Sequence, residues 1–277
     1  MESNQLPSST YIHGNSAEEQ DRLSRLNEIL NARSLAQIRF NGGENILDVG
    51  SGLGQFARAM ARNVLPDGNV LGVERDNAQL ERAESLAALD GESHLVEFRQ
   101  GNALKLPLRT EEWGTFDIVH SRFLLEHLRS PEQAVKQMLM AAKPNGKIIL
   151  EDDDHSTFRI TPEPPGAREL WKAYCRSYDR VGNDPYVGRR LVSLLHELGC
   201  TQIRNSVFFF GDCAGNPTFE TYALNVIGII EGAKKLIVDE KLLELELFEA
   251  SIESLYEWSK RPDAAIWYSV CWAEGTK

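Results

Sequence analysis

Residues 46–57 read Ile-Leu-Asp-Val-Gly-Ser-Gly-Leu-Gly-Gln-Phe-Ala, and this order predicts a buried strand, a glycine turn and the start of a helix. The strand is a short apolar run interrupted by Asp48, and apolar side chains return at helical spacing from Phe56. Glycine at alternate positions lets the backbone bend sharply and approach a ligand where a Cβ would collide. The free N–H groups at the start of the helix would face that ligand. The sequence therefore predicts that a nucleotide-like molecule lies across this turn.

The spacing of the glycines separates two classes of nucleotide cofactor. A dinucleotide site has the form G-x-G-x-x-G, but Gln55 stands where its third glycine would be, and Gly54 comes one residue early. The pattern G-x-G-x-G after Asp48 resembles motif I of the class I S-adenosylmethionine-dependent methyltransferases. An NAD(P)-dependent oxidoreductase stays open as an alternative, with Gln55 against it. The resemblance implies S-adenosylmethionine as cofactor and S-adenosylhomocysteine as product, with contacts from Asp48, Gly50, Ser51, Gly52, Gly54 and Gln55.

An acidic residue follows at the distance that such a site needs. The second predicted strand ends in Glu74, 24 positions after Gly50. Ligands of open α/β sheets bind outside the carboxyl ends of the strands, where a carboxylate can accept hydrogen bonds from both ribose hydroxyls. We therefore expect Glu74 to bind the ribose. Asp76 is expected to cap the next helix, and we include Arg75 in the cofactor site, with Leu80 beneath the adenine.

Two further matches follow the third and fourth predicted strands. Gly101, Asn102 and Ala103 stand where the family commonly has Gly-Asp-Ala, whose carboxylate accepts a hydrogen bond from the adenine amino group. Asn102 departs from this pattern, although an amide oxygen can accept the same bond and its NH₂ group can donate to a ring nitrogen. The resemblance places Ser121 and Arg122, after the fourth strand, at the methionine end of the cofactor.

The expected reaction asks little of the protein. A sulfonium makes the cofactor's methyl group electrophilic, so the protein aligns the two reactants and, for some acceptors, removes a proton. Histidine has a suitable pKa for that proton transfer, and His120, His155 and His13 are the candidate bases. His120 comes first because the end of the fourth strand faces the sulfonium. His127 is expected to tie its loop to a helix.

Several patterns are missing after the fourth strand. The sequence there has neither D/N-P-P-Y nor a Pro-Cys pair, which counts against methylation of exocyclic amines, of glutamine and of cytosine C5. Residues 151–154 are Glu-Asp-Asp-Asp and resemble one half of a magnesium site, but His120 and Ser121 offer no acid for the other half. We therefore expect no metal. The acidic run is expected to be a solvated strand end, unless Asp152 and His155 face the acceptor.

Composition limits the partners. The chain has 277 residues and a formal net charge of −11, which repels phosphate backbones, so no nucleic-acid partner is expected. The four cysteines include no C-x-x-C pair, which is typical of reduced thiols in the cytoplasm. Residues 1–21 contain neither lysine nor arginine, so no signal or transit peptide is expected. No apolar run is long enough to cross a membrane, and a homodimer is the remaining partner to consider.

The chain divides into three expected parts of one domain. Residues 1–43 form an arm and a cover helix, opened by a capping box at Ser16 and Glu19, with Tyr11 and His13 near the mouth of the site. Residues 44–155 form the cofactor-binding core, and residues 156–277 supply lid helices, the last strands and an inserted helical pair. The expected fold is α/β: a Rossmann-like, doubly wound, mostly parallel seven-stranded sheet whose last strand is antiparallel. The N-terminal helical cover and the C-terminal helical insertion add to it.

The sequence says least about the identity of the methyl acceptor. An aromatic stripe at Trp171, Tyr174 and Tyr178 is expected to be core rather than a substrate cage. Together with the low basicity it favours a small, partly apolar acceptor, aromatic metabolites included. A non-catalytic protein that binds S-adenosylmethionine as a regulator or accessory subunit stays open as the second alternative.

Overall fold

A seven-stranded sheet forms the centre of the protein, whose computed structural model describes residues 27–277. The strand order is β3-β2-β1-β4-β5-β9-β7. Pairing is parallel from β3 through β5, while β9 runs antiparallel to both β5 and β7. The predicted Rossmann-like α/β fold is thereby confirmed. The strands are β1 (Asn45–Val49), β2 (Asn69–Glu74), β3 (Val96–Gln100), β4 (Phe116–Arg122), β5 (Ala142–Asp153), β7 (Thr201–Phe209) and β9 (Ser269–Thr276).

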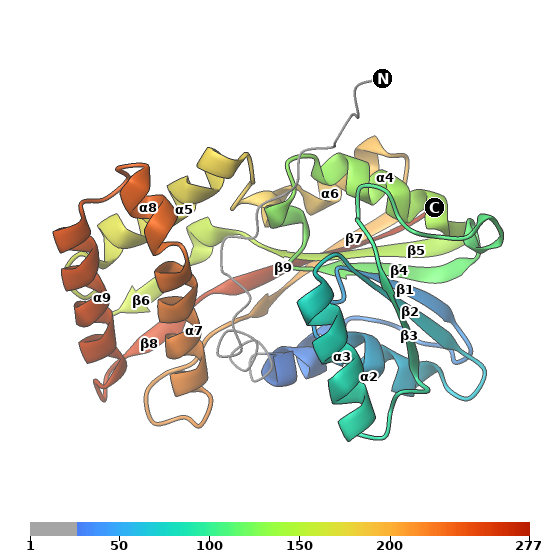
Figure 1. Ribbon diagram of the computed structural model, residues 1–277, viewed down its shortest axis with the longest axis horizontal. Helices are drawn as coiled ribbons and strands as arrows, with labels where there is room; N and C mark the ends of the chain where they lie inside the picture. The colour runs from blue at the N-terminus through green and yellow to red at the C-terminus, as the bar shows by residue number, and fades with distance from the viewer. Residues whose placement is uncertain (1–26) are drawn as a thin grey trace.

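Helices cover both faces of this sheet, as a parallel sheet requires. The helices α2 (Gln55–Val64) and α3 (Asn77–Leu89) lie on one face, and α4 (Pro131–Ala141) and α6 (Leu191–Glu197) lie on the other (Figure 1). The strands are accordingly apolar on both sides: Ile46, Leu47 and Val49 of β1 are fully buried. At the N-terminal side, residues 27–35 are helical, which agrees with the end of the predicted cover helix.

The register brings the carboxyl ends of the central strands together. Asp48 lies opposite Gly72 of β2 on one side and His120 of β4 on the other. The strand β4 continues to Arg122, which pairs with Glu151 of β5. Ser121 and Arg122 therefore belong to the strand rather than to the loop after it, because β5 extends far enough to keep pairing with them.

A second lobe lies beyond the carboxyl ends of β4 and β5 (Figure 1). Its helices are α5 (Ala167–Val181), α7 (Phe219–Gly232), α8 (Lys234–Asp239) and α9 (Leu245–Ser259), and a small sheet pairs β6 (Arg159–Thr161) with β8 (Ala265–Trp267). The end of the chain forms two strands, β8 and β9. They part at Tyr268 because β8 pairs in the lobe while β9 pairs in the main sheet.

The aromatic stripe belongs to the core of this lobe. Tyr174 and Tyr178 of α5 and Tyr222 of α7 are fully buried, and Phe248 of α9 is 1% exposed. The core interpretation of the stripe agrees with this burial. Among residues 27–277, no helix is both long and apolar enough to cross a membrane. The predicted capping box and the candidate residues Tyr11 and His13 lie outside the described residues.

Candidate functional site

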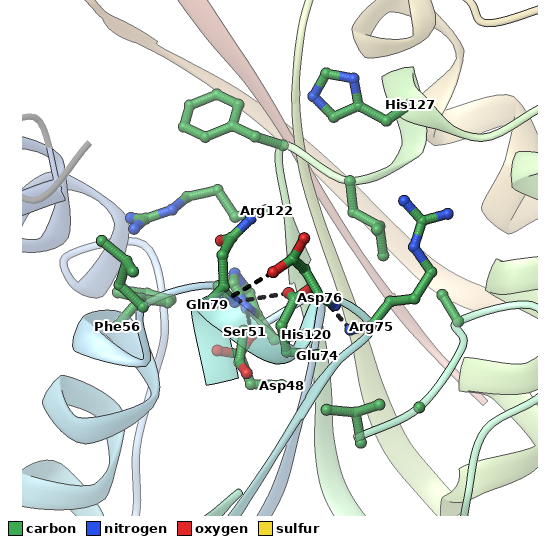
Figure 2. A pocket seen from close by; sticks show the side chains of 18 of the residues that line it. Asp48, Ser51, Phe56, Glu74, Arg75, Asp76, Gln79, His120, Arg122 and His127 are labelled. Carbon is green, nitrogen blue, oxygen red and sulfur yellow. Dashed lines mark hydrogen bonds and ion pairs between the residues drawn. The ribbon is translucent and has the colours of Figure 1, made fainter. Parts of the chain in front are cut away.

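A pocket opens at the carboxyl ends of β1, β2 and β4 (Figure 2). It is formed by the glycine turn, the end of β2, the loop after β3 and the end of β4. The structure brings most of the predicted site together here. The predicted residues that line the pocket are Asp48, Gly50, Ser51, Gly52, Gln55, Glu74, Arg75, Gly101, Asn102, Ala103, His120 and Arg122.

The glycine turn is locked to β2 by its backbone. The amides of Gly50 and Ser51 both donate to the Val73 carbonyl, at 2.8 and 3.0 Å. Gly50 has a φ of 77°, in the left-handed region that glycine tolerates without strain. A Cβ at Gly50 would also lie 3.1 Å from Leu124 Cδ1, in the wall of the pocket. The glycine therefore keeps a cradle open that any other residue would narrow.

The third glycine of the motif has a different task. Gly54 has a φ of 69°, and a Cβ there would lie 2.6 Å from Phe98 Cε1 on the neighbouring strand β3. Gly54 thus allows the turn to pack against the sheet, and it does not line the pocket. Leu80 and Ser121, also predicted to contact the cofactor, are buried and likewise lie outside the lining.

Glu74 is held rigidly at the end of β2. Its Oε1 accepts from the amides of Arg75 and Asp76, each at 2.8 Å, and its Oε2 accepts from Gly52 N at 3.0 Å. Burial raises the pKa of Glu74, while these amide hydrogen bonds oppose the rise. The bond to Gly52 couples the carboxylate to the glycine turn. The position and rigidity suit a group that accepts hydrogen bonds from a ligand's hydroxyls.

The start of α3 adds two residues that sequence reasoning did not assign to the pocket. Asp76 caps the helix as predicted, with Oδ1 accepting from Gln79 N at 3.0 Å. Asp76 and Gln79 also line the pocket beside Glu74 (Figure 2). On the next loop, Asn102 Oδ1 accepts from Leu104 N at 2.9 Å. Its second lone pair and its NH₂ group are the parts that a ligand can use.

A buried chain of charges begins at Asp48. His120 Nδ1 lies 2.8 Å from Asp48 Oδ1, and His120 Nε2 lies 3.5 Å from Glu151 Oε1. Although burial alone lowers the pKa of His120, Asp48 and Glu151 together raise it above the ordinary value. A histidine whose protonated form is stabilised by two carboxylates is a poor candidate for a general base, because it holds its proton tightly. The geometry favours a positioning role, in which His120 compensates and orients Asp48.

Arg122 connects the pocket to the N-terminal helix. Its Nη2 donates to Asn27 Oδ1 and Asn31 Oδ1, each at 2.9 Å, and its Nη1 donates to Ser34 Oγ at 3.1 Å. The guanidinium also lies over the Phe56 ring, 4.4 Å from its centroid. The three polar partners recur at i, i+4 and i+7, so they form one stripe of the helix. That spacing was the signal by which the sequence could have revealed them.

The comparison with known proteins agrees with this geometry. A family model described as a methyltransferase domain matches residues 40–191, more than half of the chain. This chain belongs to the methyltransferase-domain family. The resemblance to methyltransferases that was predicted from the glycine motif and Glu74 is thereby confirmed.

Individual relatives of this methyltransferase domain cover part of the chain. The demethylmenaquinone methyltransferase of Lactobacillus johnsonii is 27% identical over 143 residues, which are 51% of this chain and 54% of that protein. The chain spans about half the length of the curated relatives it matches. A methyltransferase structure from Bacillus halodurans, described there as putative, has a TM-score of 0.59 and 19% identity, covering 89% of this chain and 98% of that one. Phosphoethanolamine N-methyltransferase 2 of Haemonchus contortus was solved with phosphomonomethylethanolamine and S-adenosylhomocysteine. It has a TM-score of 0.61 and 15% identity, covering 98% of this chain and 60% of that one. These structures share the fold.

The acidic run of this methyltransferase domain is buried. Glu151 and Asp152 are fully buried and Asp154 is 6% exposed, so the expectation of a solvated strand end is wrong. The second lobe covers the end of β5, and the acids find partners in the 3-10 turns that follow β4 and precede α6. Asp152 Oδ2 accepts from Leu125 N at 2.8 Å, and Asp154 is paired with Arg189 at 2.6 Å.

Two further histidines, His127 and His155, lie toward the second lobe. His155, a candidate base, does not line the pocket: it is 2% exposed, with Nδ1 2.7 Å from Tyr268 Oη. His127 lines the pocket opposite Asp48 and Glu74 (Figure 2). Its ring stacks on Tyr178 of α5 at a centroid distance of 6.0 Å. His127 thus joins the loop after β4 to a helix, in agreement with the prediction.

Proposed function

We propose that this chain is an S-adenosylmethionine-dependent methyltransferase that acts on a small, partly apolar acceptor. The observation that carries the proposal is the rigid pair of the glycine turn and Glu74, joined by the hydrogen bond from Gly52 N to Glu74 Oε2. A nucleoside ligand needs this combination, because the turn gives its sugar and tail close access to the backbone and the carboxylate accepts its hydroxyls. Membership of the methyltransferase-domain family supports the same ligand.

Each part of the cofactor would meet a matching group. Glu74 accepts from the ribose hydroxyls, and Asn102 meets the adenine edge. Asp48 lies at the opposite side of the turn, where its carboxylate suits an ammonium, and Arg122 suits a carboxylate. S-adenosylmethionine supplies an electrophilic methyl group on its sulfonium. The residues of this chain orient the donor and hold its charges, which is most of the catalysis that an in-line displacement requires.

The acceptor side of the pocket is more apolar. Phe123, Leu124 and Leu128 line it on the loop after β4, beside His127. These side chains support an acceptor with an apolar or aromatic portion. The demethylmenaquinone methyltransferases among the relatives support a ring-bearing acceptor of this kind. The Haemonchus enzyme was solved with a small phosphorylated amine instead. A substrate panel should therefore include both ring-bearing compounds and phosphorylated amines.

Calorimetry with S-adenosylmethionine, S-adenosylhomocysteine and NAD⁺ tests the cofactor. We expect the first two to bind and NAD⁺ not to bind. Glu74→Gln should weaken the binding of both S-adenosyl compounds by about 10- to 100-fold, because a charge-assisted hydrogen bond is worth about 1.5–3 kcal/mol. Glu84→Gln, which changes an exposed acid of α3, is the matched control and should bind as the wild type does. Binding of NAD⁺ alone would support the oxidoreductase alternative.

A second assay separates an enzyme from a binding protein. Labelled S-adenosylmethionine is incubated with a panel of phenols, quinones, amines, phosphorylated amines and carboxylic acids. Transfer of the label to any of them supports catalysis. Tight cofactor binding without transfer across the panel would favour the regulatory alternative.

A further inference from the structure

A second group of ionisable side chains meets on the lobe side of the pocket. Glu126 comes from the short 3-10 turn after β4, Asp153 from the end of β5, and His155 from the 3-10 turn that follows. One potential ligand atom from each residue lies within 4.8 Å of the other two. The diameter of a first coordination shell is similar, because ligand atoms lie roughly 2.0–2.4 Å from a bound divalent cation.

Within the described residues, the basic side chains that approach this group are histidines: Nε2 of His127 lies 3.4 Å from Glu126 Oε1, and Nε2 of His155 lies 3.5 Å from Glu126 Oε2. Glu126 is 4% exposed, and the neighbouring Asp152 is fully buried. Within residues 27–277, no lysine or arginine forms an ion pair with Glu126, Asp152 or Asp153. Arg189, which lies nearby, is paired with Asp154 instead. Burying several carboxyl groups in this way is costly unless a cation or protons neutralise them.

Two buried oxygens lack partners, and they argue for a cation. Across the described part of the chain, Glu126 Oε2 and Asp153 Oδ1 have no hydrogen-bond partner. Glu126 Oε2 lies 3.5 Å from His155 Nε2, which is too far for a good hydrogen bond. Two adjacent ligands of one divalent ion, each about 2.1 Å from it, lie roughly 3.0 Å apart in octahedral and 3.4 Å apart in tetrahedral geometry. The separation of oxygen and nitrogen therefore suits a shared ion better than a shared proton.

The surroundings also orient the imidazole as metal sites do. His155 Nδ1 lies 2.7 Å from Tyr268 Oη, and the Tyr268 hydroxyl in turn bonds to Asp153. With its proton on Nδ1, His155 would donate to Tyr268 and direct the lone pair of Nε2 toward Glu126. The Nε2 atom has a longer contact of 3.3 Å to Tyr178 Oη. Metal-binding histidines are typically held through their other nitrogen in this manner.

We propose that Glu126, Asp153 and His155 bind one divalent cation of the Mn²⁺ class. A mixed set of carboxylates and one imidazole suits such ions, and three protein ligands leave positions for oxygen from a small molecule. The next residue after Glu126 is His127, which lines the cofactor pocket. Glu126, Asp153 and His155 do not line that pocket themselves, so the ion would lie next to the pocket rather than in it. The proposal departs from the expectation, drawn from residues 120 and 121, that no metal binds.

The first test measures the metal itself. The full chain is stripped with a chelator, dialysed and titrated with MnCl₂, with bound Mn²⁺ counted by electron paramagnetic resonance. Mn²⁺ is a better probe than Zn²⁺, because it has little affinity for the chain's free thiols. We expect one ion per chain, and at least a tenfold loss of affinity in Glu126→Gln and in Asp153→Asn. Glu163→Gln, an exposed acid on the same lobe, is the control and should bind Mn²⁺ as the wild type does.

The outcome does not depend on the stability of the variants. Circular dichroism reports whether each variant is folded. If Glu126→Gln or Asp153→Asn unfolds, Tyr268→Phe replaces it, and we expect it to lower Mn²⁺ affinity by about tenfold through a less well-oriented His155. Absence of a stoichiometric Mn²⁺ site in the folded wild type overturns the proposal, as does unchanged affinity in folded variants.

A transfer assay with and without Mn²⁺ then separates this proposal from the proposed function. Methyl transfer that needs no metal, in a protein that binds none, overturns the metal site and leaves the methyltransferase intact. Stoichiometric Mn²⁺ binding without transfer to any acceptor supports the site and contradicts the methyltransferase.

Discussion

His120 shows how a single residue changes meaning once its neighbours are known. From its place at the end of β4 it was the first candidate base. In the structure it is fully buried and enclosed by Asp48 and Glu151, which favour its protonated form. Ser34 Oγ extends the chain by donating to Glu151 Oε2 at 2.7 Å. When it is protonated, the imidazole stabilises two buried carboxylates, one of which lines the pocket.

We predict that the pKa of His120 lies above its ordinary value of 6.5. Because the folded-state pKa is raised, the contribution of His120 to the free energy of unfolding is complete below about pH 6.5 and is lost as the pH rises through the folded-state pKa. The measurement is an NMR titration of the His120 ring. Asp48→Asn should lower the midpoint by about one unit or more, whereas Asp67→Asn, in an exposed turn, should not move it. A wild-type midpoint below 6.5 would contradict the prediction.

At the level of elements, the turn between β1 and α2 combines two requirements. Its first glycine keeps the pocket open, and its last glycine lets α2 begin close to β3. The second requirement is steric, since a Cβ at Gly54 would overlap Phe98 and also touch Ala83 at 3.2 Å. The motif therefore keeps the pocket open at one end and allows close packing at the other, which explains why its third glycine lies outside the pocket.

Gly54→Ala should destabilise the protein by about 2–5 kcal/mol. A non-glycine residue at positive φ costs roughly 1–2 kcal/mol, and forcing a methyl group into a packed site adds about 1–3 kcal/mol. Gly91→Ala is the matched control, because Gly91 has a φ of 70° and nothing within 4 Å of the new Cβ. Urea unfolding measures both variants. Phe98→Leu should recover part of the loss in Gly54→Ala, and equal losses in the two alanine variants would refute the packing role.

At the scale of the whole molecule, the last strand holds distant parts of the chain together. The strand β9 lies between β5 and β7. Glu274 of β9 is 5% exposed and accepts from Lys147 of β5 at 2.9 Å and from Arg204 of β7 at 3.1 and 3.0 Å. Arg204 also donates to the Gln37 carbonyl at 2.9 Å. One carboxylate thus links three strands to the segment that precedes β1.

Glu274→Gln should lower the free energy of unfolding by about 1.5–3 kcal/mol at pH 7, the usual range for hydrogen bonds to a charged group. Burial alone would raise the pKa of Glu274, but Arg204 and Lys147 lower it below its ordinary value of 4.5. The stabilisation is therefore present above about pH 4.5 and lost as the pH falls through the folded-state pKa. Unfolding curves at several pH values should show the difference from wild type shrinking in acid. Glu257→Gln, which removes an exposed pair with Lys260, should cost at most about 0.5 kcal/mol.

Sequence alone determined the parts of this protein that depend on local pattern. The strand, turn and helix around residues 46–57 follow from apolar spacing and glycine, and the position of Glu74 follows from the length of one strand-helix-strand unit. Parallel pairing then had to bring the carboxyl ends of the strands to one edge. For that reason the pocket at this edge and the family could be predicted without coordinates.

Tertiary structure decided what depends on contacts between residues far apart in the chain. The burial of the acids at 151–154, the enclosure of His120 and the meeting of Glu126 with Asp153 and His155 all arise where the second lobe or a neighbouring strand covers the ends of β4 and β5. The division of the last strand at Tyr268 has the same origin, because β8 and β9 pair with different sheets. Spacing along a chain sets which way a side chain points within its own element. Only packing sets which groups it meets and whether water reaches them, and these govern the charge that an acid or a histidine carries.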